Sequence, residues 1–172
     1  MILGGLSTFM ATCALTLGLS AAAPQQAATA AGAAAAADRA AVLSTVQAFF
    51  DTMASKDVAG AARTVLPEGR FHAMGRPDGQ PGVRTFTNEE FLKGLPDRTT
   101  RVRERMWNPE VRVHGAVATV WTPYDFWVDG RLSHCGMDAF DLVKTAEGWR
   151  IAGGIYTVET GCAPSPLGPL TQ

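Results

Sequence analysis

Hydrophobic residues in the first half of the chain follow helical spacing. From Asp38 to Met53 they recur three or four residues apart, which predicts an amphipathic helix. Residues 58–66 predict a short second helix with Asp57 as its N-cap. Thr87-Asn-Glu-Glu90 is a capping-box sequence, so a third helix begins there and ends before Pro96.

From Thr100 onward the pattern changes to that of strands. Four long antiparallel strands are predicted, at 101–113 with an interruption at Asn108-Pro109, and at 117–128, 131–143 and 149–159. Shorter strand patterns precede them at 69–74 and 83–86, on either side of a loop rich in Gly and Pro. The fold class is therefore α+β, with N-terminal helices packed on a curved antiparallel sheet. Helices that close the concave side of such a sheet leave a cone-shaped cavity, where small ligands bind.

Asp129-Gly130 lies between two strand patterns and predicts a two-residue type I′ hairpin turn. A turn of that length sets the register, with Asp125 opposite His134 and Trp127 opposite Leu132. Directly opposed side chains lie on the same face of a sheet. One face therefore combines a carboxylate–imidazole pair with a second carboxylate and large aromatic groups, as in a pocket wall. Its residues are Trp121, Asp125, Trp127, His134, Asp138 and Phe140.

The opposite face carries Tyr124 and Cys135, and it is the alternative pocket wall. A one-residue slip in register would exchange the two faces, and the turn at His114-Gly115 does not decide between them. We favour the face with Asp125 and His134, because several ionisable groups placed among aromatic residues call for a functional explanation more than the single hydroxyl of Tyr124 does. The competing interpretation is an exposed ion pair at the rim of the sheet.

The N-terminal 37 residues contain no charged side chain. Residues 1–23 are apolar and small and end in Ala21-x-Ala23, which predicts a secretory signal peptide and a secreted or periplasmic protein. No Lys or Arg precedes the apolar run, so a membrane anchor and a misplaced start codon are the alternatives. Residues 24–37 are expected to be an Ala-rich linker, disordered or frayed. The domain then spans 38–162, and 163–172 is an irregular tail.

Two cysteines remain after cleavage, because Cys13 lies in the predicted signal peptide. An even number in an exported domain makes a disulfide between Cys135 and Cys162 plausible. The alternative is a buried free thiol at Cys135 and a loose Cys162.

The charge balance excludes some classes of partner. The chain has 15 basic and 16 acidic residues, all from Asp38 onward, without a basic stripe. Nucleic acid and an anionic membrane surface are therefore not expected as partners. No metal site is predicted, because His72, His134 and Asp138 lack any metal-binding spacing. Alternating arginines at 101, 103 and 105, with Glu104 on the other face, predict a solvated or dimer-facing side.

Several motifs resemble the nuclear transport factor 2-like superfamily, and within it the SnoaL-like proteins and those assigned to lumazine binding. The likeness covers about residues 38–162 and implies a cone-shaped, cystatin-like fold. The superfamily includes ketosteroid isomerase, scytalone dehydratase, limonene epoxide hydrolase, polyketide cyclases and non-enzymatic binding proteins. The motifs are Asn108-Pro-Glu-Val-Arg-Val113, Trp121-Thr-Pro-Tyr-Asp-Phe126, Asp129-Gly130, His134-Cys-Gly-Met-Asp-Ala-Phe140 and Gly148-Trp-Arg-Ile151.

The favoured function is an exported domain that binds a small apolar or aromatic molecule without a cofactor. The ligand would contact Trp121, Tyr124, Trp127, Asp138 and Phe140. The alternative is an isomerase, dehydratase or cyclase that uses Asp125 and His134 for proton transfer, as the resemblance implies. A third hypothesis is a structural homodimer formed through the sheet. The sequence does not decide whether the domain is an enzyme.

Overall fold

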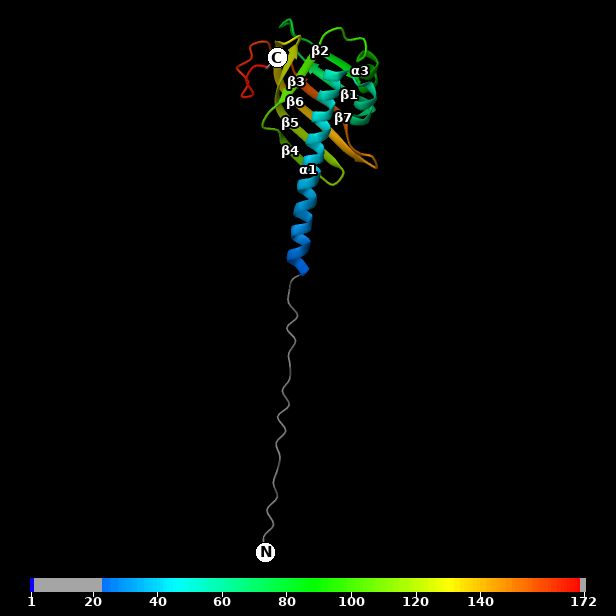
Figure 1. Ribbon diagram of the computed structural model, residues 1–172, viewed down its shortest axis with the longest axis vertical. Helices are drawn as coiled ribbons and strands as arrows, with labels where there is room; N and C mark the ends of the chain where they lie inside the picture. Colours follow the sequence, from blue (N-terminus) through cyan, green and yellow to red (C-terminus); the bar gives the residue numbers. More distant parts are fainter. Residues whose placement is uncertain (2–22, 171–172) are drawn as a thin grey trace.

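A computed structural model describes residue 1 and residues 23–170 (Figure 1). Three helices precede or interrupt the strands: α1 (Ala23–Ser55), α2 (Val58–Thr64) and α3 (Asn88–Gly94). The strands are β1 (Val65–Met74), β2 (Val83–Thr87), β3 (Val102–Met106), β4 (Glu110–His114), β5 (Val117–Val128), β6 (Arg131–Thr145) and β7 (Gly148–Thr157).

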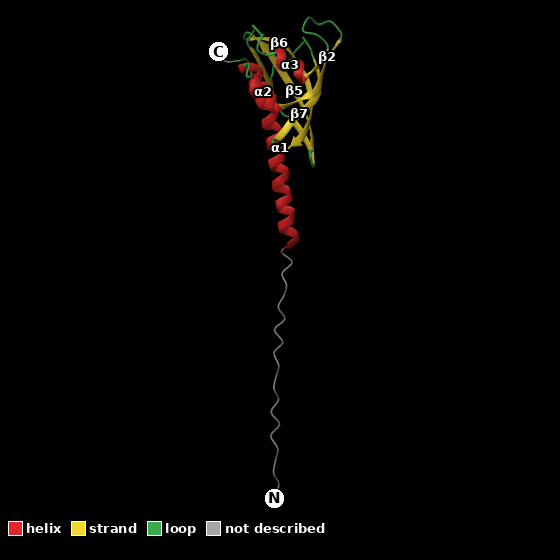
Figure 2. Ribbon diagram, turned by 90° about the vertical axis from the view of Figure 1, so that its right-hand side faces the viewer, coloured by secondary structure: helices red, strands yellow, loops and turns green. Residues whose placement is uncertain are grey.

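Helix α1 is longer than the sequence pattern predicted. Its C-terminal half carries the expected apolar stripe, with Val42, Val46 and Phe50 almost fully buried. Its N-terminal part extends beyond the sheet in both ribbon views (Figures 1 and 2). The Ala-rich segment 24–37, expected to be a disordered or frayed linker, is therefore helical, as the high helix propensity of Ala favours. The predicted signal peptide lies almost entirely outside the described residues.

The two short helices begin at the caps that the sequence predicts. The Asp57 carboxylate accepts a hydrogen bond from the Gly60 amide at the start of α2. At the start of α3, the Thr87 hydroxyl accepts from the Glu90 amide and the Glu90 carboxylate accepts from the Thr87 amide. These caps satisfy backbone donors that a helix leaves free at its N-terminus.

The seven strands form one curved sheet, with the helices collected on one side of it (Figure 2). The order is β2-β1-β7-β6-β5-β3, and β4 also pairs with β5. The antiparallel meander of β5, β6 and β7 follows the sequence-based expectation. Strand β1 instead pairs parallel with β7, so the sheet is mixed rather than purely antiparallel. Between these two paired strands the chain passes through β2, α3 and strands β3 to β6.

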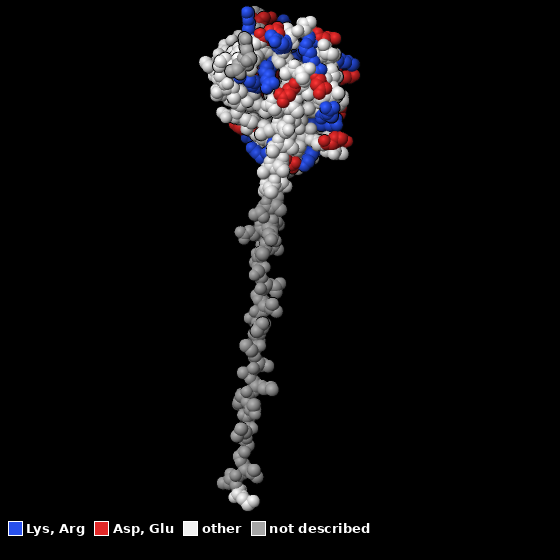
Figure 3. Space-filling model, viewed as in Figure 1, with Lys and Arg blue, Asp and Glu red and all other residues white. Residues whose placement is uncertain are grey.

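The core lies between α1 and the concave face of the sheet. It is dominated by phenylalanines: Phe49 stacks on Phe71 at 5.8 Å between ring centroids and packs against Phe91 at 5.2 Å. Phe140 of β6 packs against Phe50 of α1, with 5.9 Å between the ring centroids. No helix within residues 23–170 is long and apolar enough to span a membrane. On the face shown in Figure 3, basic and acidic side chains are interspersed.

Candidate functional site

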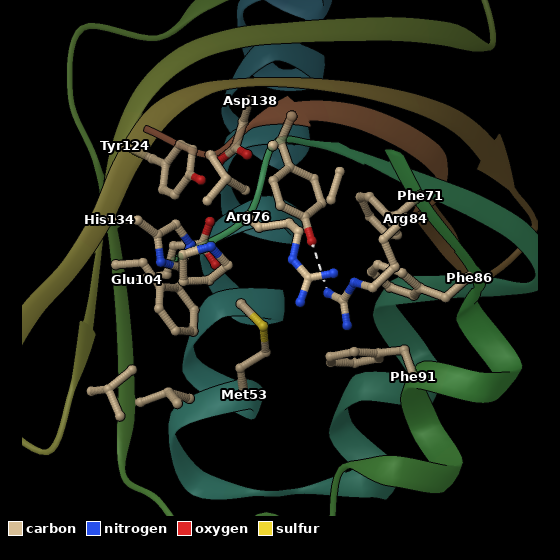
Figure 4. A pocket seen from close by; sticks show the side chains of 18 of the residues that line it. Met53, Phe71, Arg76, Arg84, Phe86, Phe91, Glu104, Tyr124, His134 and Asp138 are labelled. Atoms are coloured by element: carbon tan, nitrogen blue, oxygen red, sulfur yellow. Dashed lines mark hydrogen bonds between the residues drawn. The ribbon is translucent and has the colours of Figure 1, made fainter. Parts of the chain in front are cut away.

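A cavity of about 730 Å³ lies between the inner face of the sheet and the helices, and Figure 4 shows side chains that line it. Its apolar wall comes from elements far apart in the sequence, including Met53 of α1, Phe71 of β1, Phe91 of α3 and Phe140 of β6. Its polar side chains include both acidic and basic groups. Glu104, His134 and Asp138 lie on the sheet side, and Arg76, Arg84, Arg98 and Tyr156 also line it.

The β5–β6 hairpin supplies much of this wall, and its turn is the predicted one. Asp129 and Gly130 both have positive φ, 50° and 79°, as a type I′ turn requires. Val128 pairs with Arg131 and Trp127 with Leu132, as expected. The register then shifts, because Ser133 is an extra residue on β6 and His134 pairs with Phe126. This is a β-bulge one residue beyond the predicted match.

The bulge overturns the predicted Asp125–His134 pair. Asp125 is opposite Cys135 and lies on the outer face, while His134 lies on the inner face, where it lines the cavity. The single extra residue moves every later side chain of β6 to the other side relative to β5. The prediction that one face carries Trp121, Asp125, Trp127, His134 and Asp138 is therefore wrong. The inner face combines the β5 residues of one predicted face with the β6 residues of the other.

The two tryptophans predicted as ligand contacts do not line the cone. Trp121 has 52% of its surface exposed. Trp127 lies on the outer side, where its ring contacts the guanidinium of Arg105 at 5.3 Å from the ring centroid. Tyr124, Asp138 and Phe140 do line the cavity, and their contact with a ligand stays a prediction. The Tyr124 hydroxyl donates a hydrogen bond to the Thr157 carbonyl at 2.7 Å, so it is already used within the fold.

On the outer face, Asp125 forms a bidentate ion pair with Arg105. The two distances are 2.9 Å to Nε and 2.5 Å to Nη2, and the side chains are only 3% and 14% exposed. Arg105 Nη2 also donates to the Gly168 carbonyl of the C-terminal tail at 2.8 Å. The hydrogen bond to Asp125 raises the pKa of the Arg105 guanidinium. Both carboxylate oxygens of Asp125 accept a hydrogen bond from Arg105, so the arrangement is structural in character.

The disulfide between Cys135 and Cys162 is formed, with 5.9 Å between the Cα atoms. It attaches the tail to the same outer face of the sheet. A backbone bridge between Cys135 and Glu159 brings the chain back to the position from which Cys162 reaches β6. Residues 163–170 contain no helix or strand.

On the inner face, the carboxyl groups of Asp138 and Glu104 lie close enough for each to affect the pKa of the other. Asp138 is only 4% exposed, whereas Glu104 retains some contact with the cavity. With both groups ionised, Asp138 Oδ2 has no hydrogen-bond donor within the described part of the chain. Burial raises the pKa of Asp138 to about 8. Burial and repulsion from Asp138 raise the pKa of Glu104 well above its usual range, so the pair holds at least one proton at neutral pH.

His134 lies beside this pair in the cavity wall (Figure 4). Its ring stacks on Phe126 with 4.8 Å between centroids, and the Ser133 hydroxyl contacts its Nδ1 at 3.0 Å. Burial lowers the pKa of the His134 imidazole, which is neutral at pH 7. A protonated carboxyl can donate a hydrogen bond to a bound carbonyl, and a neutral imidazole can accept a proton.

Glu104 was not among the predicted site residues, although its strand carries a signal. Val102, Glu104 and Met106 share one face of β3, and Arg103 and Arg105 share the other. An acidic residue between two apolar residues on an inward face is unusual and could have been noticed. The proximity of Glu104 to Asp138 could not have been predicted from the sequence, because it depends on the bulge.

No three His, Cys, Asp or Glu side chains in residues 23–170 are grouped so that they could hold a metal ion. His72 lies in β1, apart from His134, and its ring contacts the Thr85 hydroxyl at 2.9 Å.

Comparison with protein-family models and with curated proteins finds no match. Solved structures do match. A nuclear transport factor 2-like protein with a cystatin-like fold from Novosphingobium aromaticivorans is 14% identical, with a TM-score of 0.64 over 78% of this chain and 90% of the other. A nuclear transport factor 2-like protein from Cytophaga hutchinsonii is 13% identical, with a TM-score of 0.59 over 70% of this chain and 97% of the other.

A proposed dehydratase of the same fold family from Streptomyces avermitilis is 18% identical, with a TM-score of 0.57 over 71% of this chain and 96% of the other. Identities this low establish the fold and leave the activity to the residues of the site. The expected resemblance is thus confirmed for the fold, whereas the SnoaL-like and lumazine-binding subtypes stay predictions.

Proposed function

We propose that this domain, which has the nuclear transport factor 2-like fold, binds a small apolar or aromatic molecule in its cone-shaped cavity. The volume of about 730 Å³ carries the proposal. Ligand pockets usually measure roughly 300–1,000 Å³ and combine apolar walls with a few convergent polar groups. Here phenylalanines from six separate elements form the wall, and the carboxyl pair and His134 are the convergent groups.

The export of the domain is part of the same proposal. The disulfide between Cys135 and Cys162 fits an oxidising compartment, and the predicted signal peptide would direct the chain to the periplasm or the exterior. A homodimer through the sheet stays a prediction.

Binding can be tested with the neutral aromatic probe N-phenyl-1-naphthylamine, whose fluorescence rises in an apolar site. Met53 projects into the cavity (Figure 4), so Met53→Trp should fill space that the probe needs and abolish the signal. Val117→Trp adds the same side chain at a position that is 55% exposed and outside the cavity, and it should leave binding unchanged. Absence of binding by the unmodified domain, or equal binding by Met53→Trp, would refute the proposal.

A second candidate function is cofactor-free proton transfer, and the Glu104–Asp138 pair favours it specifically. A carboxyl group that keeps its proton at neutral pH can stabilise an enolate by donating a hydrogen bond, while a neighbouring base removes the proton from carbon. The predicted base, Asp125, lies on the outer face and cannot act here. In this proposal the protonated carboxyl of the Glu104–Asp138 pair donates the hydrogen bond, and the neutral imidazole of His134 is the base.

Proton transfer can be measured as deuterium uptake from D₂O by 2-tetralone, an enolisable aromatic ketone, followed by NMR. Asp138→Asn and Glu104→Gln should each remove exchange above the buffer rate while retaining probe binding. Asp141→Asn, on the same strand but exposed, is the matched control and should exchange as the unmodified domain does. If the unmodified domain does not exceed the buffer rate, or if Asp138→Asn still does, this second function is wrong.

A further inference from the structure

The two ends of the cavity have opposite electrostatic character. At the sheet side, Glu104 and Asp138 are acidic. At the other side, Arg76, Arg84 and Arg98 line the same cavity, one each from the 75–82 loop, β2 and the segment between α3 and β3. The guanidinium groups of Arg76 and Arg84 point into the cavity in Figure 4.

Two of the arginines, Arg84 and Arg98, are held in place by aromatic rings rather than by acids. The Arg84 guanidinium lies 4.9 Å from the centroid of Phe86, and Arg98 lies 5.5 Å from that of Phe91. Arg84 also donates a hydrogen bond to the Tyr156 hydroxyl at 3.2 Å, shown as the dashed line in Figure 4. In the described ranges neither Arg84 nor Arg98 has a carboxylate within salt-bridge distance, whereas Arg76 pairs with the exposed Asp78 at 3.3 Å.

Placing these cations together has an electrostatic cost. Burial and the nearby charge of Arg84 both lower the pKa of the Arg98 guanidinium. Arg84 and Arg98 repel one another, and the charge of Glu104 only partly offsets that of Arg98, so an anion bound between the two arginines would relieve the repulsion. An anionic group would be repelled at the opposite end, where the carboxyl pair already shares a proton.

We propose that the ligand of this cavity is an amphipathic anion, with an aromatic or alicyclic body and one carboxylate, sulfonate or phosphate group. The anionic group lies against Arg84 and Arg98, and the body packs against the phenylalanines. An uncharged hydrogen-bond acceptor, such as a ketone, points toward Asp138. This inference rests on the proposed binding function and adds the chemical class and the orientation of the ligand.

A pair of probes that differ in charge tests the inference. The dye 8-anilino-1-naphthalenesulfonate carries the same two aromatic groups as N-phenyl-1-naphthylamine together with a sulfonate. In the double variant Arg84→Gln/Arg98→Gln, the Kd of the sulfonate dye should rise by about tenfold or more, since two charge-assisted contacts are lost. The Kd of the neutral dye should change by less than about twofold, because its apolar contacts remain.

The matched control is Arg112→Gln, which removes one positive charge from an exposed position of β4 outside the cavity. It should leave both dissociation constants unchanged. Added sodium chloride should weaken the binding of the sulfonate dye and leave the binding of the neutral dye unchanged. If the double variant does not fold, as judged by circular dichroism, each single variant is compared with Arg112→Gln in the same way.

Equal weakening of both dyes, or an unchanged Kd for the sulfonate dye, would overturn the assignment of an anionic ligand while leaving the binding function intact. Failure of the proposed binding function would give a different result from failure of this inference. If neither dye binds, or if both still bind to Met53→Trp, then the cavity is not a ligand site and this inference falls with it.

Discussion

Asp125 and Asp138 are buried carboxylates of the same hairpin, and they are held in opposite ways. Asp125 faces outward and receives two hydrogen bonds from Arg105, which also binds the tail carbonyl of Gly168. Asp138 faces inward, next to another acid, and its Oδ2 has no donor among the described residues when both acids are ionised. A buried charge with a matched partner maintains structure, whereas a buried acid beside a like group retains its proton and is available to a ligand.

The largest effect should come from breaking the satisfied pair on the outer face. Asp125→Ala leaves the Arg105 guanidinium buried without its partner, which should lower the free energy of unfolding by about 3–5 kcal/mol. Urea denaturation measures this directly. The control is Asp51→Ala, which breaks the exposed Arg103–Asp51 pair at 3.6 Å. That loss should be under about 1 kcal/mol. Similar values for the two variants would contradict the structural role of Asp125.

The disulfide should contribute almost as much as the Asp125–Arg105 pair, because it holds the tail on the same outer face. The bridge spans 27 residues, and closing a loop of that order stabilises a domain by about 2–4 kcal/mol. Reduction, or Cys162→Ser, should therefore lower the melting temperature. Thiol titration of the unfolded, unreduced domain without its first 23 residues should find no free thiol. Two free thiols would show that the bridge is not formed.

The inner pair should make stability depend on pH in a direction unusual for acidic residues. Burial raises the pKa of Asp138 from an ordinary value of 3.8 to about 8, so the folded domain binds more protons than the unfolded chain between these values. The contribution is fully present below pH 4 and is lost as the pH rises toward 8, at roughly 1 kcal/mol per pH unit.

The corresponding measurement is the free energy of unfolding at several pH values from 5 to 8. Asp138→Asn removes one of the two titrating carboxyl groups and should reduce the slope, with a domain more stable than the unmodified one at pH 8, and Asp138→Asn/Glu104→Gln should flatten the profile. Asp141→Asn, exposed on the same strand, should keep the slope. An unchanged slope in Asp138→Asn, or a slope that survives the double variant, would assign the titration to other groups.

The smallest effect is expected at Trp121, which the uninterrupted register had placed in the pocket wall. Its side chain is on the outer face and half exposed. Trp121→Ala should change the free energy of unfolding by about 0.5 kcal/mol or less, as for most surface positions. It should also leave the affinity for N-phenyl-1-naphthylamine unchanged. A loss of probe binding would instead support the register without a bulge.

The error in the predicted site has one local cause. Trp127 and Leu132 pair as predicted, and the prediction fails at the next step because Ser133 is accommodated as a bulge. Side chains alternate between the two faces of a strand, so one inserted residue moves all later side chains to the other face. The bulge therefore placed His134 and Asp138 on the face opposite to Asp125. The alternative that placed Tyr124 on the pocket wall was therefore correct for β5, and the favoured face was correct for β6.

The sequence by itself determined what depends on neighbouring residues. The helix caps at Asp57 and Thr87, the turn at Asp129-Gly130, the order of elements and the α+β class each rest on short-range backbone chemistry or on periodicity. It also made the Cys135–Cys162 bridge plausible, because these are the two cysteines outside the predicted signal peptide.

Only the tertiary structure decided which side chains share the cavity. The parallel pairing of β1 with β7, the bulge at Ser133 and the approach of Glu104 to Asp138 depend on contacts between residues far apart in the chain. The pKa of Asp138 also belongs to this level, because desolvation arises from everything packed around the group and not from its neighbours in sequence. The chemistry of the site thus follows from burial and register, which the local pattern of residues does not contain.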